Sequence, residues 1–149
     1  MQIRPATRTD IPQLLTLIRR YWDFEGITGF EALRIELLLQ RLLADSAAGA
    51  IWVAESQRTL CGYLIVVLVL SVEHCGLMGE IDEFFVLPEA RSHGTGVRLL
   101  AAAEDALARR GCVRLQLQLG AANTRARAFY QRHGYGPRSG YELYDKPLV

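Results

Sequence analysis

The stretch EIDEFFVLPEARSHGTGVRLL, residues 80–100, decides the fold of this chain. It begins as an apolar strand that carries three acids, continues into the two-glycine turn Arg91–Gly96, and ends in an Ala/Leu helix. Glycines let a backbone approach a ligand closely, and the unpaired N–H groups of a first helical turn attract negative charge. The stretch therefore predicts an anion site beside buried carboxylates.

Strand and helix patterns alternate on both sides of this stretch. Before it we expect a strand at about 2–5, a helix that begins at Thr9 or Asp10, a helix at about 30–43, and strands at about 50–55, 61–71 and 80–87. After it we expect a helix at about 95–110, a strand at 113–119, a helix from the Asn123-Thr124 cap to about 133, and strands at about 135–138 and 141–147. The run from Cys61 to Val72 is too short to span a membrane, which needs about 18 apolar residues, so we interpret it as a buried strand. With no repeat or linker, this order predicts a single α/β domain over residues 1–149.

Composition narrows the class of protein. A chain of 149 residues that is 50% hydrophobic is typical of one compact soluble domain. The net charge of +1 and the lack of basic runs favour small-molecule partners over nucleic acid or membrane. The three cysteines are far apart, with no C-x-x-C and no nearby histidine pair, so we expect reduced thiols and no metal site. The N-terminus lacks the apolar segment of a signal peptide, so we expect a cytoplasmic protein.

The order of features from residue 80 onward resembles the GNAT superfamily of N-acetyltransferases. It comprises the acidic apolar strand, R-x-x-G-x-G, an amphipathic helix, an alternating strand, Asn123 followed by Ala128-Phe129-Tyr130, and Gly134-Tyr135. The strand and turn look most like those of the polyamine acetyltransferase type. The resemblance implies a mixed central sheet of six to seven strands flanked by about four helices, with acetyl-CoA as cosubstrate and no metal. Dimers are common in this superfamily, so a homodimer is one of the assemblies it implies.

The resemblance also assigns coenzyme A contacts to matching positions. The turn and the residue after it look like the loop that holds the pyrophosphate, and the end of the preceding strand looks like the segment whose backbone pairs with the pantetheine arm. Asn123 and Tyr130 match positions at the mouth where the thioester sulfur lies. The cofactor-binding residues implied are Phe85, Val86, Arg91, Ser92, His93, Gly94, Thr95, Gly96, Val97, Asn123 and Tyr130. Two alternatives stay open, because Asn123 is also an ordinary helix cap and Arg91 could equally be a solvated surface charge.

The acids of the strand are candidate bases. A primary amine has a pKa near 10.4, so it must lose a proton before it attacks a thioester. A carboxylate in an apolar strand can accept that proton, since desolvation raises its pKa toward neutrality. We rank Asp82 first, then Glu83, then Glu80. In a regular strand Glu80 and Asp82 share one face, and Glu83 faces the other way unless a bulge reverses the alternation. The alternative for each acid is an ordinary ion pair at a sheet edge.

The remaining steps of acetyl transfer have candidates too. Backbone N–H groups near Phe85 and Val86 could stabilise the oxyanion that forms on the acetyl carbon. Tyr130, a neutral phenol, is the candidate acid for the departing thiolate. Its alternative role is ordinary packing, since Phe129 and Tyr130 could both belong to the core.

The segment Tyr21–Gly26 carries aromatic side chains and acids that would suit a cation. In the GNAT superfamily this region usually walls the acceptor pocket, which makes Tyr21, Trp22, Asp23 and Glu25 the candidate substrate-binding residues. The alternative is that the aromatic pair continues the apolar stripe of the first helix. We therefore predict an acetyl-CoA-dependent N-acetyltransferase that moves the acetyl group directly to a primary amine of a small cationic molecule. The rival hypothesis is a non-catalytic acyl-CoA sensor or interaction module.

Overall fold

The computed structural model describes residues 1–91 and 93–149, and the chain forms two compact units, Met1–Leu117 and Gln118–Val149. The first unit contains the sheet, α1, α2 and α3, and the second contains α4 (Thr124–Arg132). Ser92, predicted to belong to the pyrophosphate loop, lies outside the described residues.

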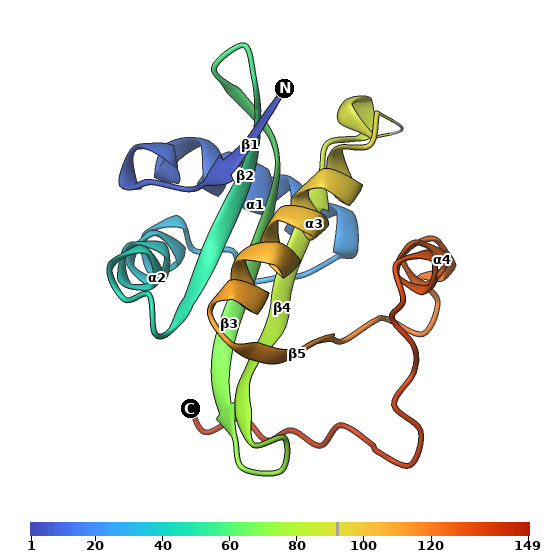
Figure 1. Cartoon of the computed structure of the whole chain (residues 1–149). Helices are drawn as coiled ribbons and strands as arrows, with labels where there is room; N and C mark the ends of the chain where they lie inside the picture. Colours follow the sequence, from blue (N-terminus) through green and yellow to red (C-terminus); the bar gives the residue numbers. More distant parts are fainter. Residues whose placement is uncertain (92) are drawn as a thin grey trace. The chain divides into compact units, whose positions relative to one another are not determined.

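The sheet of the first unit is mixed. Its strands are β1 (Gln2–Pro5), β2 (Gly49–Ser56), β3 (Thr59–Ser71), β4 (Gly76–Val86) and β5 (Cys112–Leu117), and they lie in chain order across the sheet (Figure 1). Neighbours from β1 to β4 are antiparallel, and β4 and β5 are parallel. The turn between β2 and β3 has positive φ at both Gln57 and Arg58, as the two-residue turns that match strand twist require.

Helices cover both faces of this sheet. A short 3₁₀ turn, Arg8–Asp10, leads into α1 (Ile11–Glu25), which lies with α2 (Ala32–Ala44) on one face, while α3 (Thr95–Arg109) lies on the other (Figure 1). The helices form because their apolar residues recur every three to four positions, which gives each helix one side to bury. The buried residues with the lowest exposure include Leu14, Ile18, Tyr63, Leu64, Leu99, Leu100 and Leu107.

An ionic cluster ties the N-terminal strand to this core. The guanidinium of Arg4 donates to both carboxylate oxygens of Asp10, at 2.8 Å each, and to Oε2 of Glu55 at 2.6 Å. Asp10 is buried, and the backbone N–H of Thr7 also donates to it at 2.7 Å. These bonds, led by those from Arg4, lower the pKa of Asp10 to about 2. The cluster therefore connects β1, the start of α1 and β2.

Two predictions about strands were wrong. The described residues contain five strands rather than six to seven, because residues 135–149 form no strand. Alternation favoured strands there, but Gly136, Pro137 and Gly140 interrupt the segment, and Pro137 has no N–H for a strand ladder. Tyr141, Leu143 and Tyr144 are accordingly exposed.

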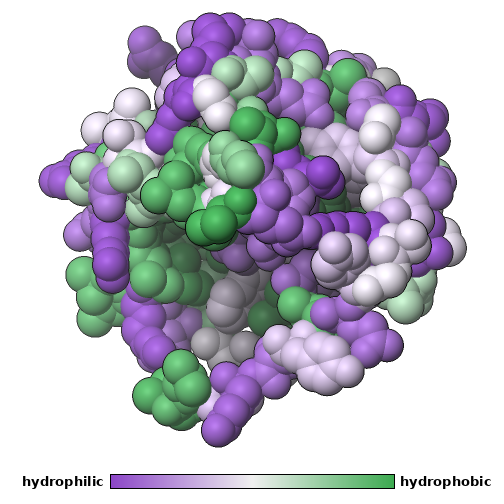
Figure 2. All heavy atoms as spheres, turned by 60° about the horizontal axis from the view of Figure 1, so that its bottom comes forward, coloured by the Kyte–Doolittle hydropathy of each residue, from purple (hydrophilic) through white to green (hydrophobic). Residues whose placement is uncertain are grey.

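The interpretation of residues 61–72 as a buried strand holds only for its inner part. Its outer end, at the bottom of Figure 1, exposes Val69, Leu70 and Val72. Figure 2, turned so that this side comes forward, shows hydrophobic areas there among hydrophilic ones. In the part of the chain that the structure describes, no helix combines the length and the apolar character that crossing a bilayer requires.

Candidate active site

A β-bulge in β4 sets the direction of the strand acids. Two consecutive residues of β3, Ile65 and Val66, pair with Glu83 and Ile81, so Asp82 is an extra residue on β4. Because consecutive residues of β3 point to opposite faces, Ile81 and Glu83 also lie on opposite faces. The sequence left open whether a bulge reverses the alternation, and the structure contains that bulge.

Glu83 therefore lies on the face that α1 covers, together with Tyr63 and Phe85. The indole N–H of Trp22 donates to Oε1 of Glu83 at 2.7 Å, and the hydroxyl of Tyr63 donates to Oε2 at 2.8 Å. Burial raises the pKa of Glu83, the two hydrogen bonds lower it, and the charge of Asp82 raises it further. A partly buried carboxylate with a raised pKa has the environment that general-base catalysis needs.

The other two acids have different surroundings. Asp82 is exposed, and partial desolvation followed by the charge of Glu80 raises its pKa. Because Asp82 is exposed, water weakens this effect. Glu80 shares the face of Glu83 and accepts a hydrogen bond from Nε2 of Gln116 at 3.1 Å. Glu83 is thus the acid whose two oxygens both accept hydrogen bonds from aromatic side chains, one of them, Tyr63, fully buried.

The four predicted acceptor residues divide into two pairs. Tyr21 packs against Phe85 with ring centroids 5.8 Å apart, and burial followed by the charges of Glu25, Glu83 and Asp82 raises its pKa to about 12. Trp22 holds Glu83. Asp23 and Glu25 are exposed at the end of α1. Tyr21 and Trp22 therefore lie beside the candidate base Glu83. Of the two acids, Glu25 is the one whose charge helps to raise the pKa of Tyr21.

One edge of β4 is open beside Glu83. Within the described residues the pairing of β4 with β5 ends at Ile81 and Leu117, although β4 continues to Val86. The N–H of Leu87 donates to Cys61 on β3 at 2.9 Å, so by alternation the peptide groups of Phe85 point to β3 and those of Val86 point to the open edge. Of the two predicted oxyanion donors, Val86 is the one whose N–H faces that edge.

The glycine turn links this edge to α3. Gly94 has φ +72°, a conformation that glycine adopts without strain. Among the described residues, the first backbone N–H of α3 that bonds to a carbonyl one turn back is that of Arg98, to Gly94 at 3.0 Å, so the N–H groups of Gly96 and Val97 lie ahead of that bond. Buried Thr95 fastens the turn, because its hydroxyl donates to the carbonyl of Ala90 at 2.9 Å. These positions retain the backbone geometry of an anion site.

The side chains of Arg91 and His93 contact the protein's own backbone in this structure, and their roles toward the coenzyme stay predictions. Nε of Arg91 donates to the carbonyl of Val86 at 2.8 Å, and its guanidinium carbon lies 5.3 Å from the ring centre of Phe24 and 5.6 Å from that of Phe85. Arg91 is thus folded against the open edge of β4. His93 is exposed, and its Nδ1 lies 3.0 Å from the carbonyl of Arg91.

The second unit contains the two remaining predicted residues. Oδ1 of Asn123 accepts the backbone N–H of Ala126 at 3.0 Å, which is the geometry of a helix cap. Tyr130 is buried, and within this unit its ring centroid lies 5.3 Å from those of Phe129 and Tyr135. Asn123 therefore caps a helix and Tyr130 packs among aromatic rings, which are the alternative roles named for them from the sequence. Their roles at the coenzyme thioester stay predictions.

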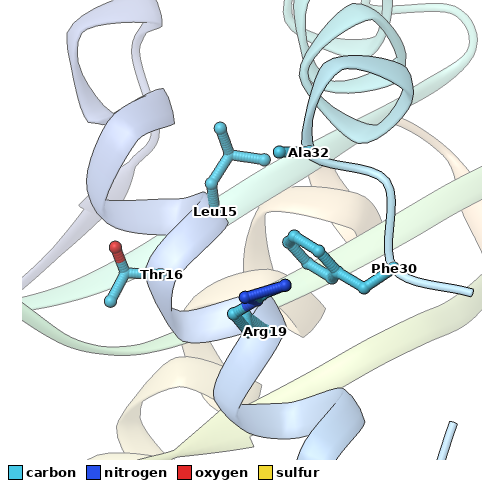
Figure 3. Close-up of a pocket in the computed structure, with 5 residues that line it drawn as sticks. All are labelled: Leu15, Thr16, Arg19, Phe30 and Ala32. Carbon is cyan, nitrogen blue, oxygen red and sulfur yellow. The ribbon is translucent and has the colours of Figure 1, made fainter. Parts of the chain in front are cut away.

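Tyr63 and Phe30 are site residues that sequence reasoning missed. Tyr63 stands alone as a hydroxyl in the apolar run from Leu60 to Leu70, which is the signal that could have identified it. Phe30 lies in the connection between α1 and α2, where its ring meets the indole of Trp22 edge-on at 5.6 Å. It lines a hollow of about 300 Å³, and the guanidinium carbon of Arg19 lies 4.7 Å from its ring centre (Figure 3). The other residues that line the hollow are Leu15, Thr16 and Ala32.

Comparison with known proteins identifies the family of this chain. The sequence model of the acetyltransferase (GNAT) family matches residues 11–135. The uncharacterized N-acetyltransferase YhfO of Bacillus subtilis (strain 168) is 30% identical over 148 residues, which cover 97% of this chain and 95% of YhfO. Aminoglycoside N(6')-acetyltransferase type 1 of Klebsiella aerogenes is 26% identical over 148 residues, 98% of this chain and 96% of that protein.

A solved structure shows the same architecture. An integron cassette protein from the mobile metagenome of Cole Harbour Salt Marsh is 27% identical, with a TM-score of 0.87 over 99% of this chain and 91% of that one. The open edge of β4, the acidic bulge and the glycine turn therefore occur in a chain that matches this family over most of its length. The chain belongs to the GNAT acetyltransferase family and is an acyltransferase of the N-acetyltransferase type.

Proposed function

We propose that this enzyme transfers the acetyl group of acetyl-CoA directly to a primary amine of a small cationic molecule, with Glu83 as the general base. The observation that carries the proposal is the bulge in β4, which turns Glu83 toward Trp22 and Tyr63 next to the strand edge that β5 leaves open. A base and a backbone edge lie within a few residues of each other on one strand. An unpaired strand edge offers backbone N–H and C=O groups that can bond to the amide groups of a ligand.

The residues present fit coenzyme A. Val86 offers its N–H and C=O at the open edge, and the start of α3 offers N–H groups to a phosphate. When bound, the coenzyme supplies a thioester whose acetyl carbon is open to attack by an amine. The carbonyl of Val86 now accepts Nε of Arg91, so we expect the coenzyme to replace that bond and to leave the guanidinium for a phosphate oxygen.

The proton of the amine goes to Glu83 in this proposal. Its raised pKa makes the carboxylate a better proton acceptor than a solvated glutamate. Tyr130, a neutral phenol, remains the proposed acid for the thiolate. The acids near Tyr21, namely Glu25, Asp82 and Glu83, would attract a cationic acceptor. One relative is named as an aminoglycoside acetyltransferase, and an aminoglycoside is a small molecule with several amino groups. This name supports a small acceptor of the same chemical kind.

Release of free coenzyme A thiol from acetyl-CoA tests the proposal. The panel should contain aminoglycosides, linear polyamines, neutral amines, acidic amines and a peptide N-terminus, at several concentrations. We expect thiol release that depends on the acceptor and is fastest with the polycationic amines. A preference for acidic amines would contradict the cationic acceptor. Tight binding of acetyl-CoA in calorimetry with no turnover of any amine would instead favour an acyl-CoA sensor.

A further inference from the structure

The carboxylate of Glu83 is held by two donors of different chemistry. An indole N–H can only donate a hydrogen bond, whereas a phenol hydroxyl can donate or accept. Trp22 therefore requires Oε1 of Glu83 to be an acceptor at all times. Tyr63, which donates to Oε2 in the ionised state, can turn its hydroxyl and accept a hydrogen bond from a protonated Oε2. Oε2 is thus the oxygen that can take a proton without losing its partner.

Trp22 itself is fixed by the connection between α1 and α2. The ring of Phe30 meets the indole at 87°, an edge-on contact that is favourable for aromatic pairs. Arg19 lies over Phe30, in the hollow that Leu15 and Ala32 also line (Figure 3). Since Phe30 borders a hollow of about 300 Å³, its contacts with Trp22 and Arg19 hold a ring that is not enclosed in the core.

Building on the proposed function, we propose that Trp22 and Tyr63 are unequal positioning residues for Glu83. Trp22 always donates to Oε1, whereas Tyr63 donates to Oε2 when Glu83 is ionised and accepts from Oε2 when it is protonated. Phe30 keeps the indole of Trp22 in place. In the reaction, the N–H bond of the amine breaks, an O–H bond forms at Oε2, and the Tyr63 hydroxyl turns from donor to acceptor. No group is oxidised or reduced. The connection between α1 and α2 thereby controls the base through the contact between Phe30 and Trp22.

The two donors should have different effects on the proton of Glu83. Loss of the indole N–H removes a bond that stabilises the ionised form, so the pKa of Glu83 should rise. Loss of the Tyr63 hydroxyl also removes a bond that lowers the pKa of Glu83, but this hydroxyl can accept a hydrogen bond from the protonated form as well, so the pKa should rise less than it does without the indole. Among the described residues of the first unit, the ionisable groups near Glu83 are Asp82 and Glu80 on β4, Tyr63 on β3, and Tyr21, with Glu25 near it, on α1. All five are acids or phenols.

The chain offers a matched control because it has two tryptophans. Trp52 is buried in β2, where it pairs with Leu64. Leu64 alternates with Tyr63, so Trp52 lies on the opposite face of the sheet from Glu83. Trp52→Phe therefore removes an indole of equal size without touching Glu83. It also leaves Trp22 as the single tryptophan, whose fluorescence reports the charge of the carboxylate that it contacts.

The first measurement is a fluorescence pH titration of the Trp52→Phe protein, which does not depend on activity. We expect one transition from Glu83 that disappears when Glu83→Gln is added. Adding Tyr63→Phe should move its midpoint by less than about half a pH unit. A flat titration, or a transition that survives Glu83→Gln, would overturn the proposal. If the titration behaves as expected but no amine is acetylated, the contact stands and the proposed function fails.

The second measurement is the acid limb of kcat/KM against pH for acetyl transfer. We expect Trp22→Phe to move this limb to higher pH by about one unit, because the indole N–H bonds more strongly to the ionised carboxylate than to the protonated one. Phe30→Leu should move it in the same direction by less, and Trp52→Phe should leave it in place. Circular dichroism and thermal unfolding show whether each variant is folded. A larger movement for Tyr63→Phe than for Trp22→Phe would refute the unequal roles.

Discussion

Replacement of Glu83 by glutamine separates its chemistry from its packing. Glutamine has nearly the same shape, its carbonyl can still accept the indole N–H of Trp22, and its NH₂ can donate to the hydroxyl of Tyr63, which then accepts. Both contacts persist, so we expect the free energy of unfolding to change by less than about 1 kcal/mol. What the variant lacks is a proton acceptor.

The expected loss of turnover follows from the role of the base. General-base catalysis contributes about 10²–10⁴-fold, which corresponds to about 3–5 kcal/mol of activation free energy. Asp82 supplies the matched comparison because it is adjacent on the bulge but exposed. Asp82→Asn should lower kcat by about tenfold or less, because it removes only a nearby negative charge.

The assay is steady-state release of coenzyme A thiol, with coenzyme affinity measured by calorimetry. We expect Glu83→Gln to lose turnover while it binds acetyl-CoA as the wild type does. If Asp82→Asn loses more turnover than Glu83→Gln, then Asp82 is the base, as the order of candidates from sequence had it, and the argument from burial and hydrogen bonding fails.

Three further outcomes are expected. Tyr130→Phe should lower kcat strongly and leave acetyl-CoA affinity in calorimetry almost unchanged, and unaltered turnover would remove Tyr130 from the mechanism. Asn123→Ala should lower stability by about 1 kcal/mol in urea unfolding, because it removes the cap on the N–H of Ala126; no change would mean that water satisfies that N–H. Hydrogen bonds from Arg4 lower the pKa of Asp10 from 3.8 to about 2. The ionised Asp10 therefore adds about 2 kcal/mol to the free energy of unfolding, which is fully present above about pH 4 and is lost as the pH falls through about 2. Asp10→Asn should therefore reduce stability at neutral pH and reduce it much less near about pH 2, and an equal loss at both would show that the charge on Asp10 is not the cause.

The local signals of the sequence predicted much of the first unit. The apolar run of β4, the glycine turn and the helix after it depend on side chains that are close in the chain, and the structure contains all three. The mixed sheet and the GNAT family were likewise confirmed. Local patterns also predicted strands after Gly134, which was wrong, because a strand needs a partner as well as alternation.

The candidate base depended on information that the local sequence does not contain. The direction of Glu83 follows from the register of β3 against β4, and a single inserted residue at Asp82 reverses it. Trp22 is 61 positions away from Glu83 in the chain, and Tyr63 is 20 positions away, so neither contact has a sequence spacing that would reveal it. Arg91 could be assigned to a loop, but its bond to the carbonyl of Val86 required the structure.

The most direct test of the central claim is the mass of the acceptor after reaction. An aminoglycoside and a linear polyamine are incubated with acetyl-CoA and either the wild type or Glu83→Gln, and the products are analysed by mass spectrometry with fragmentation to locate the modified atom. We predict that the wild type adds one acetyl group to a primary amine nitrogen and that Glu83→Gln forms this product far more slowly. Acetylation at equal rates by both proteins, or no acetylated amine with the wild type, would contradict the account.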